Sequence, residues 1–300
     1  AHFTPIFAGD LLKDFPEKEL GSNFNSFFDL ASSFSGYEGV SWINKFAMDG
    51  KIYFRELVPT KSLPKVSVIT ATSAEDTIIG NELDNTLFGL DGNDLLVGGL
   101  GNDFIDGGAG LDTVKVDDQF GPPYLRNYGL TQSSDGSWTV SFIGPTIAKY
   151  PPPPTNGTDK LINVERLQFS DKSFALDLDG NAGKTAKVIG AVLGSAFVSN
   201  PTYVGIGIDY LDKGMSYSDL GALALKAVGL ASKDAIVSTL WYNVLGFTAS
   251  AEQKAPYIKL LNDGMNAGDL VVLAADTIFN TSKINLVGLA QTGLEYLPVS

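Results

Sequence analysis

The chain of 300 residues contains no cysteine and a single histidine, His2. Without cysteine it has no disulfide framework, no thiolate metal site and no cysteine nucleophile. That single histidine is the second residue of the sequence, so we expect neither a histidine-based catalytic triad nor a histidine zinc site. The G-x-S-x-G, Walker and dinucleotide-binding motifs are also missing. A pair of glycosidase-type carboxylates stays open, because such a pair needs only Asp and Glu.

Positive charge is scarce as well. The chain has 21 Lys and Arg against 34 Asp and Glu, a net charge of −13. This balance argues against nucleic acid or an anionic membrane surface as a partner. No apolar run approaches the length of a transmembrane helix, so we do not expect the chain to span a membrane. Residues 71–118 hold eleven acidic residues and one lysine, so most of the excess charge lies there.

That acidic segment repeats with a strict period of nine residues. From residue 71 to residue 115 the blocks read ATSAEDTII, GNELDNTLF, GLDGNDLLV, GGLGNDFID and GGAGLDTVK. The sixth position holds Asp76, Asn85, Asp94, Asp103 and Asp112, and the eighth holds Ile78, Leu87, Leu96, Ile105 and Val114. A short fixed period predicts a solenoid, in which each repeat contacts mainly its neighbours. A glycine-rich acidic linker would have no reason to keep an apolar residue at every eighth position.

Each block is expected to form one turn and one short strand. Glycine at the first, second and fourth positions allows a tight six-residue turn, and the last three residues form the strand with the eighth side chain inward. Two blocks then complete one coil, so that each block lies beside the block after next. The carboxylates of position six and the turn carbonyls would lie between stacked turns. Oxygen ligands at that density suit calcium.

The blocks GGLGNDFID and GGAGLDTVK resemble the RTX family of secreted calcium-binding repeats, whose consensus is G-G-x-G-x-D-x-U-x. The resemblance implies a parallel β-roll with Ca²⁺ between turns, held by the position-six Asp and by carbonyls of positions one to four. The best site pairs the turns 89–94 and 107–112, a weaker one pairs 80–85 with 98–103, and a third pairs Asp76 with Asp94. The implied ligands are Gly89, Asp91, Gly92, Asp94, Gly107, Ala109, Gly110, Asp112, Gly98, Leu100, Gly101, Asp103, Asn85 and Asp76.

The same resemblance implies a secreted protein, or one at the extracellular cell surface. The first residues show no basic region followed by a long apolar stretch, so no secretory signal peptide is visible. RTX proteins usually leave the cell by type I secretion, with an uncleaved C-terminal signal. That route would account for a secreted chain of this kind.

Four regions are expected: an aromatic-rich N-terminal module (1–65), the calcium-binding roll (66–118), a β-rich cap (119–181) and an α-helical domain (182–300). In the first, residues 24–34 and 42–46 carry aromatic residues near helical spacing, either as a helical core or as a docking surface, and a strand follows at 51–58. In the cap, residues 130–133 and 138–143 predict a hairpin, and prolines 151–154 an exposed loop. Residues 158–176 resemble the block that closes RTX rolls, with Val164, Leu167 and Phe169 in the core.

Asp177, Asp179 and Asn181 in the sequence DLDGN resemble the start of an EF-hand loop. The twelfth position of that loop is Val188 rather than Glu, so the motif is incomplete. Two interpretations remain, a further calcium site or a simple turn that caps a helix.

The last region is helical by pattern, with apolar residues recurring in 186–197, 220–228, 235–245, 257–261 and 270–278. The sequence GMSYSDL at 214–220 recurs as GMNAGDL at 264–270, each with a helix-capping residue, Ser216 or Asn266, and an acid three positions later. Met215 and Met265 are expected in the core. Two stretches, NAGKTAKVIGAVLG and STLWYNVLGFTAS, resemble a helical repeat domain of unknown function found at the C-terminus of RTX and surface-layer proteins.

The predicted fold class is therefore α+β and multidomain. The predicted function is a non-catalytic structural protein of a cell surface, surface layer or extracellular matrix that folds and assembles on calcium. Its expected partners are calcium ions and either further copies of itself or another surface protein or glycan. Two alternatives stay open: a calcium-stabilised adhesion module that binds carbohydrate or protein, and a polysaccharide-cleaving enzyme.

Overall fold

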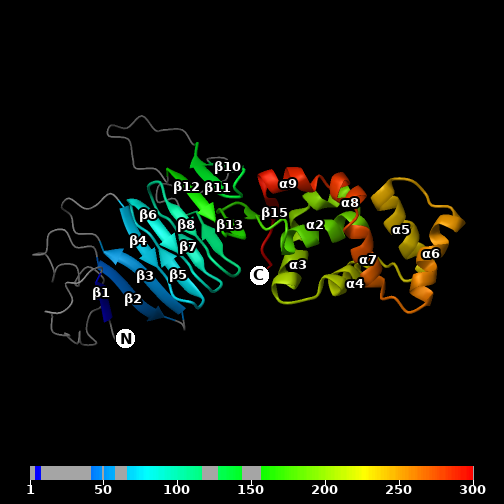
Figure 1. The fold of residues 1–300 in the computed structure, drawn as a ribbon, viewed down its shortest axis with the longest axis horizontal. Coiled ribbons are helices and arrows are strands. Elements are labelled where there is room, and N and C mark those ends of the chain that lie inside the picture. The colour runs from blue at the N-terminus through cyan, green and yellow to red at the C-terminus, as the bar shows by residue number, and fades with distance from the viewer. Residues whose placement is uncertain are drawn as a thin grey trace, which may run out of the picture. The chain divides into compact units, whose positions relative to one another are not determined.

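The computed structural model describes residues 4–7, 42–48, 51–57, 66–116, 128–143 and 157–299 (Figure 1). The chain divides into two compact units, residues 1–171 and 172–300. The first unit is built of strands and the second mainly of helices, so the predicted α+β class is confirmed. The finer division into four regions stays a prediction.

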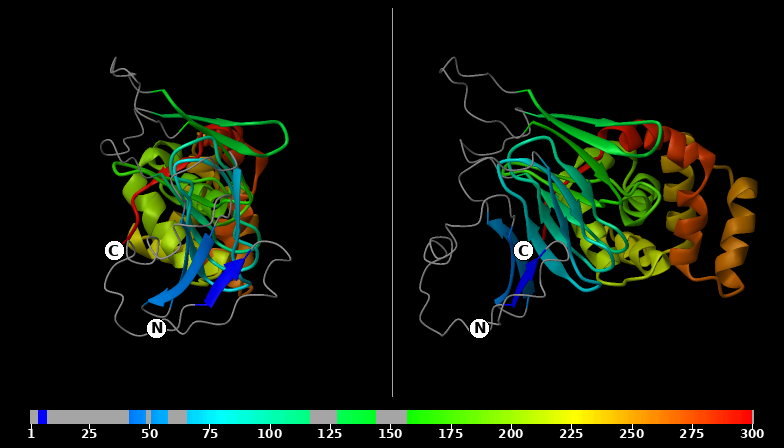
Figure 2. Two further views of the ribbon diagram at one scale, coloured as in Figure 1. Left: turned by 90° about the vertical axis from the view of Figure 1, so that its left-hand side faces the viewer. Right: turned by 60° about the vertical axis from the view of Figure 1, so that its left-hand side comes forward.

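Two sheets make up the described part of the first unit (Figures 1 and 2). In spatial order, one sheet contains β1 (Thr4–Phe7), β2 (Trp42–Met48), β3 (Lys51–Leu57), β5 (Asp76–Ile79), β7 (Leu95–Val97), β9 (Thr113–Lys115) and β13 (Arg166–Gln168). The other contains β10 (Tyr128–Gln132), β11 (Trp138–Phe142), β12 (Thr158–Ile162), β8 (Phe104–Asp106), β6 (Asp84–Phe88) and β4 (Val66–Thr70).

Consecutive nonapeptides alternate between these sheets. Strand β7 pairs in parallel with β5 and β9, and β6 pairs in parallel with β4 and β8. Each block therefore lies beside the block after next, as the period predicts. The eighth-position side chains are buried between the sheets and form the core, with Ile78, Leu87, Leu96, Ile105 and Val114 at most 3% exposed.

The helix considered for residues 42–46 is wrong. These residues lie in β2, which forms an antiparallel hairpin with β3. The pair Met48 and Lys51 leaves only Asp49-Gly50 between the strands. Asp-Gly is a strong two-residue hairpin signal, and it outweighs the approximate helical spacing of the aromatic residues. The strand predicted at 51–58 is confirmed as β3, whereas the aromatic residues of 24–34 lie outside the described residues.

The hairpin predicted in the cap is also confirmed. Strands β10 and β11 pair antiparallel, with Leu130 opposite Val140. Between them the amide of Ser133 donates to the carbonyl of Ser137 at 2.8 Å. The expected core residues Val164, Leu167 and Phe169 are at most 6% exposed. The proline run at 151–154 lies outside the described residues.

The second unit is a helical domain with one short pair of strands (Figure 1). Its elements are β14 (Ser173–Ala175), α2 (Asn181–Val192), η3 (Ser195–Ser199), α3 (Pro201–Asp212), α4 (Tyr217–Ala227), α5 (Lys233–Leu245), α6 (Ala251–Asn262), α7 (Ala267–Ala275), α8 (Ile278–Lys283), α9 (Leu286–Thr292) and β15 (Leu294–Tyr296). Among the helices that the structure describes, none has the length and apolarity needed to cross a lipid bilayer.

Sequence reasoning missed α3, because its glycines weaken the apolar pattern. Those glycines allow close packing within the unit. A Cβ on Gly205 would overlap the carbonyl of Leu297, and one on Gly207 would lie 2.5 Å from Cγ2 of Thr185. Asn200 caps the helix by accepting from the amides of the first turn, and Pro201 follows at the first helical position.

The internal repeat places α4 against α7. A Cβ on Gly268 would overlap the carbonyl of Ser218, the residue fifty positions earlier, and a Cβ on Gly221 would lie 2.9 Å from Cβ of Val271. The two helices thus touch through equivalent positions. Ser216 and Asn266 cap them as predicted. Met215 and Met265, partly buried, pack on the same apolar core.

Candidate metal centre

Glycine at position four lets the turns of alternate blocks stack in contact. Gly92, Gly101 and Gly110 have φ values of +131°, +107° and +146°, a region that other residues rarely adopt. A Cβ on Gly110 would also overlap the carbonyl oxygen of Gly92. Backbone carbonyls and position-six side chains are thereby brought together between turns.

The position-six carboxylates form two ladders with a step of eighteen residues. In one, the Oδ1 of Asp94 accepts from the amide of Asp76 at 2.8 Å, and the Oδ1 of Asp112 accepts from the amide of Asp94 at 2.9 Å. In the other, the Oδ1 of Asp103 accepts from the amide of Asn85 at 2.8 Å. The three pairs of turns predicted from the sequence are therefore all brought together.

One oxygen of each of these carboxylates is buried with no hydrogen-bond donor in the part of the chain that the structure describes. These atoms are Asp76 Oδ1, Asp94 Oδ2, Asp103 Oδ2 and Asp112 Oδ2. The four residues are at most 3% exposed. Burying a charged oxygen without a partner is costly, so a cation is the natural complement of this arrangement.

The carboxyl pKa values report the same environment. Burial raises the pKa of Asp94 to about 6 and that of Asp103 and Asp112 to about 7. A backbone N–H opposes the rise in each case, and neighbouring carboxylates add to it. For Asp112 the first of these neighbours is Glu165. A bound divalent cation would favour the ionised form that burial disfavours.

Asn85 makes the second site different. Its Oδ1 accepts from the amide of Asn81 at 2.7 Å, and its Nδ2 lies 3.1 Å from Asn81 Oδ1. A neutral amide held by local hydrogen bonds supplies less charge than an aspartate. The site between turns 80–85 and 98–103 therefore relies on the charge of Asp103, and that this site is the weaker one stays a prediction.

The remaining predicted residues lie in the same stacked turns. Asp91 and Ala109 face each other in a parallel bridge, and the amide of Gly92 donates to the carbonyl of Ala109 at 2.9 Å. Gly89 packs on the carbonyl of Gly107, where a Cβ would overlap. Among the described residues no three carboxylates converge on one point. A cation held here must therefore take part of its coordination from backbone carbonyls, as the turn positions Gly98, Leu100 and Gly101 allow.

Sequence reasoning missed the partners at position five and at the end of each ladder. Asp84 and Asn93 accept from the amides of Asn102 and Leu111 at 2.8 and 2.9 Å and so join alternate turns along an exposed edge. Asp159 and Glu165 accept from the amides of Asp103 and Asp112 at 2.9 and 2.8 Å and continue the two ladders beyond the repeats. The spacing G-x-D-x-L at 157–161 was a signal that could have revealed Asp159.

The DLDGN sequence has the geometry of a helix cap. The Oδ2 of Asp177 accepts from the amide of Asn181 at 2.8 Å, and the Nδ2 of Asn181 donates to Asp212 at 2.9 Å. Both contacts fix the start of α2. Of the two interpretations, the geometry favours the turn that caps a helix.

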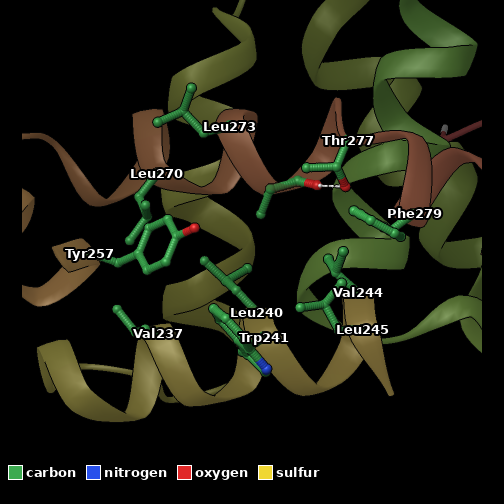
Figure 3. Close-up of a pocket in the computed structure, with 11 residues that line it drawn as sticks. Val237, Leu240, Trp241, Val244, Leu245, Tyr257, Leu270, Leu273, Thr277 and Phe279 are labelled. Carbon is green, nitrogen blue, oxygen red and sulfur yellow. Dashed lines mark hydrogen bonds between the residues drawn. The ribbon is translucent and has the colours of Figure 1, made fainter. Parts of the chain in front are cut away.

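A second feature is an apolar pocket of about 340 Å³ in the helical unit, between α5, α6, α7 and α8 (Figure 3). Trp241 and Tyr257 line it, with ring centroids 6.0 Å apart and planes at 69°. Phe279 and Leu273 lie on the same pocket and are 60% and 54% exposed. The walls offer aromatic and aliphatic contacts and few polar groups.

Comparison with known proteins identifies the repeats. Residues 79–114 match the RTX calcium-binding nonapeptide repeat in four copies, so the chain contains RTX repeats and their metal is Ca²⁺. RTX repeats are typical of secreted proteins. No curated protein matches the chain.

Among solved structures, the extracellular lipase LipA from Serratia marcescens is similar at 20% identity and a TM-score of 0.27. The match covers 36% of this chain and 15% of the lipase chain.

Proposed function

We propose that residues 66–116 form a calcium-loaded β-roll and that the chain is a secreted, non-catalytic structural protein of a cell surface, surface layer or extracellular matrix. The observation that carries the proposal is the set of buried carboxylate oxygens without donors between the stacked turns. The ligands would be the position-six carboxylates of Asp76, Asp94, Asp103 and Asp112 with carbonyls of the adjoining turns. Calcium would neutralise the repelling carboxylates and hold the turns together.

Folding on calcium also suits secretion. Low cytosolic calcium would leave the acidic repeats unfolded before export, and millimolar calcium outside would fold them. The rigid roll would then present the helical unit for assembly. The test is electron microscopy and light scattering of the full chain at millimolar calcium and in chelator. Ordered assemblies that form only with calcium would support the proposal, and a chain that stays monomeric at all calcium concentrations and does not attach to cell surfaces would contradict it.

The apolar pocket favours a second candidate, a calcium-stabilised adhesion module. Exposed Leu273 and Phe279 at an aromatic-lined pocket would suit apolar side chains of a protein partner. Leu273→Ser and Phe279→Ser should then weaken attachment of the calcium-loaded chain to isolated cell surfaces. Val287→Ser is the matched control, because Val287 is 76% exposed on α9 and does not line the pocket. Equal attachment of all three variants would remove this candidate.

A further inference from the structure

The ladder that contains Asp103 continues past the matched repeats into β12. Strand β12 pairs in parallel with β8, with Lys160 opposite Phe104 and Leu161 opposite Ile105. Alternate nonapeptides pair in the same way elsewhere in the stack. This register places Leu161 at position eight, Asp159 at position six and Gly157 at position four. Residues 157–162, GTDKLI, are therefore in register with positions four to nine of a nonapeptide, although residues 116–156 separate them from the fifth block.

The hydrogen bonds of this segment repeat those of the nonapeptides. The amide of Asp103 donates to Asp159 Oδ1 at 2.9 Å, the amide of Thr158 to Asn102 Oδ1 at 2.9 Å, and the amide of Lys160 to the carbonyl of Asp103 at 2.8 Å. The equivalent bonds between the third and fifth blocks run from Asp94 N to Asp112 Oδ1, from Leu111 N to Asn93 Oδ1 and from Thr113 N to the carbonyl of Asp94, at 2.9, 2.9 and 2.8 Å.

Gly157 has the conformation and the contact of a position-four glycine. Its φ is +63°, and a Cβ there would overlap the carbonyl oxygen of Gly101, the position-four residue of the fourth block. Gly110 stands in the same relation to Gly92. Gly157 thus packs against the turn 98–103 in the way that Gly110 packs against the turn of Gly92.

Two buried carboxylates lie at the junction where the segment with Gly157 packs against the turn 98–103. Asp159 is 8% exposed and Asp103 is 3% exposed, and the Oδ2 of Asp103 has no donor in the described part of the chain. The adjacent cation, Lys160, points elsewhere, with its ammonium 3.2 Å from Asp135 in the hairpin turn. Burial, followed by the charge of Asp103, raises the pKa of Asp159 to about 8. The junction therefore has the same excess of buried negative charge as the recognised sites.

We propose that residues 157–162 take positions four to nine of a sixth nonapeptide and that a further calcium ion binds between them and the turn 98–103. Its ligands are the carboxylates of Asp103 and Asp159 with carbonyls of that turn. The carbonyl of Gly157 is left out of this set, because it accepts from the amide of Phe142 at 2.8 Å. The inference rests on calcium binding by the matched repeats and adds a ligand, Asp159, from outside residues 79–114.

The other ladder ends differently and supplies the control. Glu165 accepts from the amide of Asp112 at 2.8 Å, as Asp159 does from Asp103. However, only Asn163 and Val164 lie between the end of β12 and Glu165, so a six-residue turn with its carbonyls does not fit there. Glu165 continues its ladder with this hydrogen bond, and the proposal places no ion beside it.

The test compares Asp159→Asn with Glu165→Gln in the full chain. Both substitutions remove one charge and keep an oxygen that can accept the same backbone N–H. Native mass spectrometry at saturating calcium should count one ion fewer in Asp159→Asn than in the wild type, and the wild-type count in Glu165→Gln. An unchanged count in Asp159→Asn, or an equal loss in Glu165→Gln, would overturn the assignment. A wild-type chain without bound calcium would overturn the proposed function as well.

A measurement on the unaltered chain covers the case in which Asp159→Asn fails to fold. Crystals grown with terbium in place of calcium should give an anomalous peak between the carboxylates of Asp103 and Asp159, in addition to peaks in the repeats. Peaks between the turns of residues 71–115, with no peak beside Asp159, would overturn the sixth nonapeptide and leave calcium binding by the roll intact.

Discussion

In the nonapeptide stack, each block buries one aliphatic side chain at position eight and one carboxylate or amide at position six. The helical unit instead buries two large apolar clusters, one around Leu240 and Val271 and one around Ile189 and Ile208. In the described part of that unit, residues 172–299, the buried side chains include no carboxylate. The nonapeptide stack therefore buries charge together with apolar side chains, whereas the helical unit is stabilised by apolar burial.

The magnitudes decide which part depends on metal. Burying one aliphatic side chain contributes about 1.5–3 kcal/mol, whereas burying an ion without a partner costs several kcal/mol. In residues 71–115 seven aliphatic side chains and four carboxylates are buried, so the cost of burying the ions offsets much of the apolar gain in the ionised roll. In the described part of the helical unit no buried carboxylate offsets the free energy gained by apolar burial. We therefore expect calcium to control the folding of the nonapeptide stack and to leave the helical unit unchanged.

The largest expected effect is therefore selective unfolding by chelator. Removing calcium should abolish hydrogen-exchange protection in residues 76–115 and leave it in α2–α7. At calcium about 1,000-fold above the dissociation constant, each site adds about 4 kcal/mol to stability, and chelator removes all of it. Exchange measured by mass spectrometry separates the two parts, with magnesium at the same ionic strength as the control. Equal loss of protection in both parts would show that calcium does not act on the nonapeptide stack alone.

A second prediction concerns two position-six residues within the stack. Asp94 bonds to the turn of Asp76 on one side and to that of Asp112 on the other, whereas Asn85 is a neutral amide tied to Asn81. Asp94→Ala should weaken calcium binding at least tenfold, or about 1.4 kcal/mol. Asn85→Ala should cost less. Isothermal titration of both variants measures the difference, and equal losses would show that the charge at position six does not set affinity.

The third prediction is a reversal of pH dependence. Without calcium, the folded pKa values of about 6 to 7 for Asp94, Asp103 and Asp112 lie above the unfolded value of 3.8. The folded form then holds more protons between pH 4 and pH 7, so its stability falls as the pH rises through that range. With calcium, binding needs ionised carboxylates, so stability should rise over the same range. Thermal unfolding at pH 5 and pH 7.5, with and without chelator, tests whether the pH dependence of stability changes sign when calcium is removed.

Much of the stack could be predicted from the sequence, because a nine-residue period fixes both the turn and the strand. The period located the buried position-six side chains and the pairing of alternate blocks. The regular count ends at residue 115, so only the local spacing G-x-D-x-L at 157–161 pointed to Asp159. In the N-terminal region, the spacing of aromatic residues did not distinguish a helix from the β2–β3 hairpin. Pairing with a distant strand decides such cases, and local periodicity does not contain it.

In the helical unit the sequence predicted the capped repeat but not the glycine-rich helix α3. The motif with Ser216 and Asn266 identified two helix starts through the chemistry of the cap. In α3, by contrast, Gly205 and Gly207 are explained only by the groups they pack against, Leu297 and Thr185. Those groups lie far away in the chain. Packing of this kind becomes visible only in the structure.

The smallest expected effect tests the helical side of the comparison. The hydroxyl of Ser216 accepts from the amide of Asp219 at 3.1 Å and caps α4. Ser216→Ala leaves that amide without its partner and should destabilise the unit by about 1 kcal/mol, a fall of a few degrees in Tm. Because no calcium ligand is involved, the fall should be the same in calcium and in chelator. Ser282→Ala, at an exposed position within α8, is the matched control and should leave Tm within error. A fall in Tm that appears only in chelator would mean that calcium stabilises the helices as well. Calcium would then not act on the nonapeptide stack alone.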